Sequence, residues 1–195
     1  MDVYDEELTK SISTWEVLNE LEKLDSHINL KNIVKMDSIK TIDEIEKIVN
    51  ELRELDKIIV TTNGSFDILH SAHINFLKKA KNLGDILIVL INSDESVRRN
   101  KGSKRPIIPE NERAYILSEL KSVDYVVIFS QDKPLEYLER IKPNIHVKGG
   151  SWIEERIKEE KELMKKLGGV FKLFELEEGY SSTKIIDEII KANRI

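Results

Sequence analysis

Hydrophobic and polar positions change their spacing near residue 57, and this change divides the chain into two regions. Before it, apolar residues recur three or four positions apart, which is the spacing of an amphipathic helix. One such stripe consists of Ile42, Ile45, Ile48, Val49, Leu52 and Leu55, and an earlier one of Leu8, Ile12, Trp15, Leu18 and Leu21. Thr41 followed by Glu44 has the pattern of a capping box. We therefore predict an N-terminal helical extension over residues 1–56.

After residue 57, short apolar runs alternate with helical stretches. The runs are nearly continuous and rich in β-branched residues, which favours strands covered on both faces; they cover residues 58–60, 86–91, 126–129, 145–147 and 170–174. Residues 74–83, 110–120 and 135–141 have helical spacing. This alternation predicts an α/β domain over residues 57–195, a doubly wound, Rossmann-like parallel sheet of five strands flanked by helices. Ligands of such sheets bind at the carboxyl ends of the strands.

Composition narrows the class of protein. Of the 195 residues, 40% are hydrophobic and 34% are charged, which is typical of a globular domain with a charged surface. No apolar run is long enough to span a membrane, and the acidic start of the chain does not resemble a signal peptide, so we expect a cytoplasmic protein with no membrane partner. The net charge of −5 argues against a nucleic-acid partner. The absence of cysteine excludes thiolate catalysis and cysteine-based zinc sites.

The end of the first predicted strand carries the first candidate chemistry. Asn63 and Gly64 follow the apolar run, and the glycine permits a tight turn and a close approach of the backbone to a ligand. A helix is expected to begin near Ser71, and its free N–H groups would form a phosphate site. His70 and His73 are three residues apart, so both imidazoles can face this site and donate hydrogen bonds to a phosphorus centre. A purely structural histidine, or a metal-binding pair without a nearby third ligand, is the alternative.

Two further segments carry positive charge or glycine at predicted strand ends. Lys101 and Arg105 belong to a basic cluster after the second strand, which is expected to form a mobile loop that neutralises a triphosphate; a solvated charge run is the alternative. Lys148, Gly149 and Gly150 follow a later strand. Two glycines let a base or ribose lie against the backbone, although alone they indicate only a turn.

The remaining candidates lie near predicted helix starts. Asn92 and Asp94 follow the second strand, and Asp94 is either a site residue or a helix N-cap. Arg113 lies on the helix that is expected to start near Pro109, where an exposed position without a function is the alternative. The last helix is preceded by three hydroxyl residues, Ser181, Ser182 and Thr183, which form a second anion site or simply a helix cap.

The segment Gly64-Ser65-Phe66-Asp67-Ile68-Leu69-His70-Ser71-Ala72-His73 resembles the nucleotidyltransferase signature G-x-F-D-x-x-H-x-G-H. Proteins with this signature transfer a nucleotidyl group from a nucleoside triphosphate to a phosphorylated acceptor and release pyrophosphate. Ala72 replaces the last glycine of the signature. Alanine is compatible with a helical backbone at this position and incompatible with a positive φ.

Residues 57–190 are similar to the adenylyltransferase domain of bacterial ADP-heptose synthase. The resemblance extends to Leu83-Gly84-Asp85, Asn92-Ser93-Asp94, Lys101-Gly102, Arg105-Pro106, Arg113, Val123-Asp124, Val147-Lys148-Gly149-Gly150 and Ser181-Ser182-Thr183. The Lys-Gly-Gly element favours the heptose type. Leu176 replaces the arginine that glycerol-3-phosphate cytidylyltransferases tend to carry, whereas Ser151 replaces an aspartate usual in the heptose type.

The resemblance implies a role for each candidate residue. His70, His73 and Lys101 would be catalytic, stabilising the triphosphate in the transition state. Substrate binding is implied for Asn63, Gly64, Ser65, Phe66, Asp67, Asn92, Asp94, Arg105, Arg113, Lys148, Gly149, Gly150, Ser181, Ser182 and Thr183. Asp67 is also a candidate for holding the turn.

The resemblance also implies the substrates and the assembly. The reaction would join AMP from ATP to a phosphorylated small molecule such as heptose 1-phosphate. Mg²⁺ would arrive with the nucleoside triphosphate, without a protein metal site, and the protein would be a homodimer. The alternatives are a cytidylyltransferase or FAD synthetase-like enzyme on the same fold, and a non-catalytic nucleotide-binding protein.

Overall fold

A computed structural model describes residues 38–150, 154–175 and 181–193. The chain divides into two units, residues 1–37 and 38–195. The predicted helix with Leu8 and Trp15 lies outside the described residues, as do Ser151 and Leu176. The sequence placed the domain boundary at residue 56, whereas residues 38–56 lie in the same unit as the sheet.

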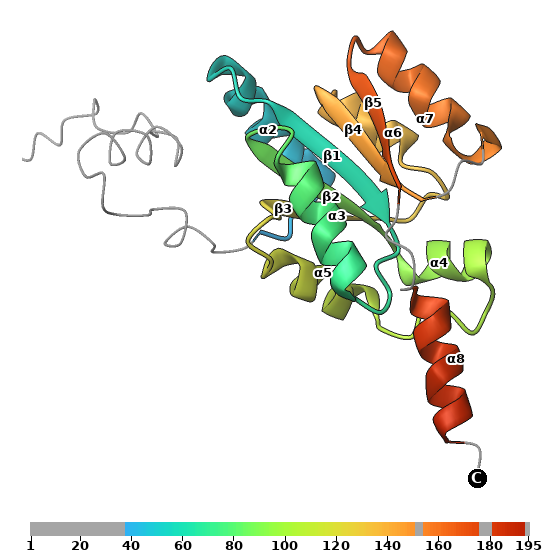
Figure 1. The fold of residues 1–195 in the computed structure, drawn as a ribbon. Helices are drawn as coiled ribbons and strands as arrows, with labels where there is room; N and C mark the ends of the chain where they lie inside the picture. Colours follow the sequence, from blue (N-terminus) through green and yellow to red (C-terminus); the bar gives the residue numbers. More distant parts are fainter. Residues whose placement is uncertain (1–37, 151–153, 176–180, 194–195) are drawn as a thin grey trace, which may run out of the picture. The chain divides into compact units, whose positions relative to one another are not determined.

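A five-stranded parallel sheet forms the centre of the second unit (Figure 1). Its strands are β1 (Ile59–Gly64), β2 (Ile86–Asn92), β3 (Tyr125–Phe129), β4 (Ile145–Gly149) and β5 (Val170–Phe174). The order is β3-β2-β1-β4-β5, so the chain first builds outward from β1 on one side and then returns to build on the other. This confirms the predicted Rossmann-like fold. The reversal next to β1 places the expected ligand site at the carboxyl ends of β1 and β4.

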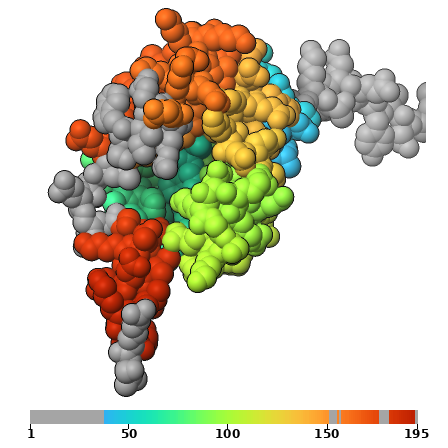
Figure 2. All heavy atoms as spheres, turned by 90° about the vertical axis from the view of Figure 1, so that its right-hand side faces the viewer, coloured from blue at the N-terminus to red at the C-terminus, as the bar shows by residue number. Residues whose placement is uncertain are grey.

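Helices surround the sheet. They are α2 (Ile42–Glu54), α3 (Ser71–Lys81), α4 (Asp94–Lys101), α5 (Glu110–Ser118), α6 (Leu135–Ile141), α7 (Glu154–Lys166) and α8 (Ser182–Ala192). The space-filling view in Figure 2 shows teal atoms of the β1–α3 region between the lime atoms near α4 and the red atoms of α8. The sequence did not predict α7 as a helix, and it indicated α4 only through the alternative that Asp94 is a helix N-cap. α4 carries Asp94–Arg98 and Glu95–Arg99 ion pairs across one turn, so the charged run that suggested a loop supports a helix instead.

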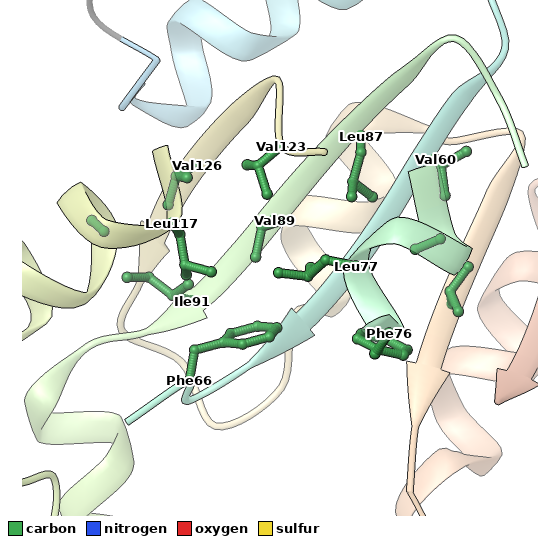
Figure 3. Packing of buried hydrophobic residues seen from close by; sticks show 13 residues of the cluster. Val60, Phe66, Phe76, Leu77, Leu87, Val89, Ile91, Leu117, Val123 and Val126 are labelled. Atoms are coloured by element: carbon green, nitrogen blue, oxygen red, sulfur yellow. The ribbon is translucent and has the colours of Figure 1, made fainter. Parts of the chain in front are cut away.

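The main core lies between the sheet and the pair α3 and α5 (Figure 3). Phe76 and Leu77 of α3 and Leu117 of α5 pack against alternate residues of the strands, among them Val60 and Val89. β2 is fully buried from Ile86 to Ile91, as its continuous apolar run predicts. β5 differs from the prediction, because it is an edge strand and Val170 is exposed.

The helix α2 and the residues just before it pack against other parts of the same unit. Ile45, Val49 and Leu52 are fully buried, and α2 contacts α6. The predicted capping box is present: Thr41 Oγ1 accepts from Glu44 N at 3.3 Å, and Glu44 Oε2 accepts from Thr41 N at 2.8 Å. Ahead of α2, the backbone of residues 38–40 pairs with Val126, which protects the β3 edge of the sheet.

Candidate active site

The two signature histidines lie together at the start of α3. His70 is the N-cap residue, and its ring stacks on that of His73 with the centroids 3.9 Å apart. His73 Nδ1 accepts a long hydrogen bond, 3.4 Å, from the His70 backbone N–H. This bond leaves the proton of a neutral His73 on Nε2, where it is a donor. Both rings therefore belong to the helix terminus whose free N–H groups favour an anion.

Burial keeps these imidazoles neutral in the free protein. It lowers the pKa of His73 to about 4, and the charges of His70 and Lys101 act in the same direction. Burial also lowers the pKa of His70. Each neutral ring retains one N–H donor, and a bound polyphosphate would shift both pKa values upward because it favours the charged form.

Lys101 reaches the same place from α4, the helix that follows the neighbouring strand β2. It is the last residue of α4, not part of a loop as the sequence predicted, and its Nζ donates to Ser65 Oγ at 2.7 Å. Burial lowers its pKa, and the charges of Arg105 and Arg113 lower it further, while Asp67 opposes them. Because Nζ is held by a neutral hydroxyl and not by a carboxylate, it can turn to a phosphate without breaking an ion pair.

In contrast to Lys101, the arginines of the basic cluster after β2 are paired with carboxylates. Arg98 pairs with Asp94, Arg99 with Glu95 and Asp132, and Arg105 with Asp67. The structure therefore gives these side chains a role in holding the chain around the site. Lys101 differs from them in its partner.

Asp67 fastens the loop that follows α4. Its side chain is fully buried, and it accepts hydrogen bonds from Arg105 Nε at 2.6 Å and from the backbone N–H groups of Ile107 and Ile108 at 2.8 and 2.9 Å. A carboxylate with three donors of this kind is a structural anchor. This arrangement agrees with the role of Asp67 in holding the turn, and its contact with substrate stays a prediction.

Arg113 connects the ends of β1 and β2. Its side chain is fully buried, and it donates to Ser65 O at 2.6 Å, Asn92 O at 2.9 Å, Ile108 O at 2.9 Å and Asp94 Oδ1 at 2.7 Å. Of its five N–H donors, four are used in these bonds. The geometry thus supports Arg113 as a scaffold for the two strand ends, while the phosphate contact that the resemblance implies stays a prediction.

The polar residues after β2 have structural partners. Asn92 Nδ2 donates to Ser96 Oγ at 2.9 Å, and the Asp94 backbone N–H donates to Glu110 at 2.5 Å. The N-cap of α4 is Ser93, whose hydroxyl accepts from Ser96 N at 3.2 Å, so the prediction of Asp94 as an N-cap is wrong by one residue. Asp94 instead lies in the first turn, where its charge suits the helix dipole.

The end of β1 keeps polar atoms without a partner. Thr62 Oγ1 and Asn63 Oδ1 are buried and form no hydrogen bond with any residue that the structure describes. Buried acceptors of this kind normally find a partner, so they fit a ligand with donor groups at this strand end. Gly64 packs closely here, because a Cβ on it would lie 3.1 Å from the Phe66 ring. Phe66 itself is buried in the core and has a positive φ of 45°.

Ala72 lies inside α3, with its side chain 4% exposed. A helical backbone has a negative φ, so alanine occupies the position of the signature glycine without strain.

The hydroxyl residues before the last helix are partly used in capping. Ser181 is the N-cap of α8 and accepts from Lys184 N at 3.1 Å. Ser182 Oγ donates to Ile68 O at 3.4 Å, which brings the first turn of α8 next to the β1–α3 loop. Thr183 is exposed. The cap interpretation thus holds for Ser181, and phosphate binding by all three stays a prediction.

Lys148 is held on the opposite face of the sheet from α3. Its Nζ donates to both carboxylate oxygens of Glu160 on α7, at 2.5 and 2.7 Å. Gly149 ends β4, and Gly150 has a φ of 145°, which only glycine adopts readily. The sequence reasoning missed Glu160, although Glu160 follows Ile157 by three residues and precedes Met164 by four, on the apolar stripe of α7. A charged residue on such a stripe is the signal that could have identified it.

Two turns that belong to the resemblance lie before β2 and β3, away from the site. Asp85 accepts from Ile58 N at 2.7 Å, and Asp124 accepts from Leu87 N at 2.7 Å. These bonds secure the amino ends of strands. Gly84 allows the close approach there, because a Cβ would come within 2.7 Å of Ile58 O.

Comparison with known proteins agrees with this geometry. The model of the cytidylyltransferase-like family matches residues 61–188. The bifunctional protein HldE of Geobacter metallireducens is 46% identical over 154 residues, covering 79% of this chain and 31% of that protein. The protein of the same name from Syntrophotalea carbinolica is 43% identical over 166 residues, covering 85% of this chain and 31% of that protein. The chain therefore spans about a third of the length of these curated relatives.

A solved structure is also similar to this chain. A lipopolysaccharide core biosynthesis protein from Thermoplasma volcanium is 35% identical, with a TM-score of 0.51, and the match covers 64% of this chain and 99% of that one. In the part of the chain that the structure describes, no helix has the length and apolar character needed to cross a membrane. With the histidine pair, Lys101 and the strand-end loops in place, the family match identifies the chain as a nucleotidyltransferase that belongs to the cytidylyltransferase-like family.

Proposed function

We propose that the protein transfers the AMP group of ATP to a sugar 1-phosphate, such as heptose 1-phosphate, and releases pyrophosphate. The choice of acceptor rests on the sequence resemblance to the adenylyltransferase domain of ADP-heptose synthase. The solved relative, which is named for lipopolysaccharide core biosynthesis, supports a sugar acceptor. The proposal includes a cytoplasmic location, where ATP is available.

One observation carries the assignment to phosphoryl chemistry. The stacked His70 and His73 rings and the Lys101 ammonium converge on the end of β1, at the N-terminus of α3. Lys101 Nζ donates to Ser65 Oγ in the loop that leads from β1 to these rings, and burial together with the charges of His70 and Lys101 lowers the pKa of His73. Imidazole N–H donors, a cation and free helix N–H groups together favour a polyphosphate.

The reaction needs position and charge stabilisation more than a base. An oxygen of the acceptor phosphate attacks the α-phosphorus of ATP, the bond from that phosphorus to the bridging oxygen breaks, and pyrophosphate leaves with the electron pair. The acceptor phosphate is already ionised near neutral pH, so no strong general base is required. His73 Nε2–H and Lys101 Nζ would donate to the phosphate oxygens as charge accumulates there.

Mg²⁺ fits this site as a companion of the triphosphate. No group of three or more acidic or histidine side chains with metal-binding geometry occurs among the described residues. The nearby carboxylates of Asp67 and Asp94 are held by Arg105 and Arg113. We therefore propose that the triphosphate oxygens supply the ligands of the metal, which when bound neutralises part of their charge.

The test compares His73→Ala with Lys78→Ala, an exposed position on the same helix. Pyrophosphate release is measured with ATP or CTP and a panel of aldose 1-phosphates. His73→Ala should lower turnover by at least ~100-fold, which is the scale of one lost transition-state donor, while its unfolding curve stays close to the control. A His73→Ala enzyme with near-normal turnover would remove His73 from the mechanism.

The same assay separates the alternatives. Activity with CTP and a polyol phosphate would indicate a cytidylyltransferase, and activity with FMN as acceptor an FAD synthetase-like enzyme. ATP or CTP binding without pyrophosphate release from any acceptor would indicate a non-catalytic nucleotide-binding protein. The proposed homodimer is tested by light scattering after size exclusion.

A further inference from the structure

A buried polar network connects β1, β4 and α7 behind the proposed site. The His146 side chain is fully buried, and that of Glu160 is 2% exposed. His146 Nδ1 lies 2.8 Å from Thr61 Oγ1, and its Nε2 lies 3.6 Å from Glu160 Oε2. Lys148 Nζ binds both oxygens of the same carboxylate. One charged pair and one imidazole thus connect the sheet with α7.

The charges in this network are fixed by burial and contact. Burial lowers the pKa of His146 more than the contacts with Glu160 and Thr61 raise it, and the charge of Lys148 lowers it as well. Burial would raise the pKa of Glu160, but the contact with His146 and the charge and hydrogen bonds of Lys148 outweigh it, so this pKa is lowered. Glu160 is therefore an ionised carboxylate and His146 a neutral ring. The Thr61 hydroxyl can donate to Nδ1, which leaves the Nε2–H directed at Glu160.

The charged pair lies where an apolar pair would be expected. Glu160 lies on the apolar stripe of α7 between the buried residues Ile157 and Met164. Replacing a buried ion pair with apolar residues of similar size is often neutral or stabilising. A charge at a position where the helical pattern predicts an apolar residue is unusual, and such exceptions concentrate at functional sites.

The network ends at the glycine turn of the proposed site. Lys148 immediately precedes Gly149 and Gly150, and the Gly150 N–H donates to Phe174 O at 3.2 Å. Val147 is in register with Thr62, so the Lys148-Gly149 segment continues beside Asn63 and Gly64 at the carboxyl edge. A Cβ added to Gly150 would meet no atom of the described residues within 4 Å.

We propose that Glu160 is a positioning residue. By binding the Lys148 ammonium on the α7 side of the sheet, it fixes the Gly149-Gly150 backbone for the nucleoside part of the nucleotide. This inference rests on the proposed nucleotide-binding function. It predicts that the network controls nucleoside binding and leaves polyphosphate binding unchanged.

The test measures the Kd of ATP and of inorganic tripolyphosphate by calorimetry for the wild type, Glu160→Gln and Lys148→Met. Tripolyphosphate has the phosphates of ATP without the nucleoside. Both variants should weaken ATP binding about fivefold, which corresponds to one lost hydrogen bond, and leave the Kd of tripolyphosphate unchanged. Equal losses for both ligands in Lys148→Met would place Lys148 on the phosphates and overturn the proposal. ATP binding at the wild-type Kd in Glu160→Gln would overturn it as well.

A double variant keeps the test valid if a single variant fails to fold. Glu160→Leu with Lys148→Met removes both charges, so no buried charge is left unpaired. It should fold and show the same selective loss of ATP affinity, whereas wild-type affinity for ATP would limit the network to a structural role and refute the proposal. If the wild-type protein binds ATP and releases pyrophosphate, and Glu160→Gln binds ATP with the wild-type Kd, only this inference is refuted. A wild-type protein without either property refutes the proposed function too.

Discussion

Replacement of Arg113 by methionine should act mainly on the stability of the fold and not on phosphate binding. Methionine fills a similar volume but removes the four donated hydrogen bonds to Ser65, Asn92, Ile108 and Asp94. Three backbone carbonyls and one carboxylate lose a partner, and among the described residues Asp94 keeps only the distant Arg98, at 3.8 Å.

The structure sets the size of the effect. Because the Arg113 side chain is fully buried, its ion pair with Asp94, itself 21% exposed, is only partly screened by water. Removing one partner of a buried pair typically costs about 3–5 kcal/mol, which is a large part of the about 5–15 kcal/mol that stabilises a typical domain. Arg113→Lys keeps the charge but offers a single ammonium, so its cost should be about half as large, since fewer of the acceptors are reached.

Urea unfolding followed by circular dichroism measures these differences. The control is Arg99→Met, since Arg99 is 41% exposed and water screens its surface ion pairs with Glu95 and Asp132. Arg113→Met should lower the free energy of unfolding by several times the control value. A variant that unfolds like the control, but has lost affinity for tripolyphosphate, would show that Arg113 is a phosphate ligand and not a scaffold.

Three further predictions concern the helix starts. Ala72→Gly should lower the free energy of unfolding by about 0.5–1 kcal/mol through the flexibility of glycine in a helix and leave turnover unchanged; a large gain in turnover would show that the signature glycine is needed. Proton NMR of the free protein should show His73 titrating near pH 4, so the free energy of unfolding falls as the pH is lowered from 6.5 towards 4, because the unfolded chain binds the proton first; titration near 6.5 contradicts the burial of this ring. Thr41→Ala should cost about 1 kcal/mol through the lost cap, with Thr41→Ser close to wild type and pyrophosphate release unaffected in both; equal stability of all three would refute the capping role.

The fold was predictable because its strands are short, apolar and separated by helical spacing. The run from Ile86 to Ile91 is buried at every position, and α3 begins at Ser71 as expected. The sequence indicated α4 only through the possible cap at Asp94, because its charges hide its period; the cap at Ser93 and the ion pairs across one turn establish the helix. Electrostatics that stabilise a helix look like a solvated loop when hydrophobicity alone is considered.

The sequence could predict those parts of the site in which the local backbone geometry alone brings the residues together. His70 and His73 are brought together by helical geometry, which the spacing specifies. Lys101 and Ser65 are 36 positions apart, and Lys148 and Glu160 are on different elements, so their pairing depends on how helices cross the sheet. Single-sequence patterns do not contain that information. The burial of Arg113 by neighbouring loops was unpredictable for the same reason.

The most direct test of the account is the product formed from ATP, Mg²⁺ and heptose 1-phosphate. The reaction is followed by mass spectrometry of the nucleotide sugar together with a coupled assay of pyrophosphate. We predict equal amounts of pyrophosphate and ADP-sugar, with both lost together in His73→Ala and retained in Lys78→Ala. Nucleotide binding without pyrophosphate formation from any sugar phosphate, or product formation that does not depend on His73, would contradict the account.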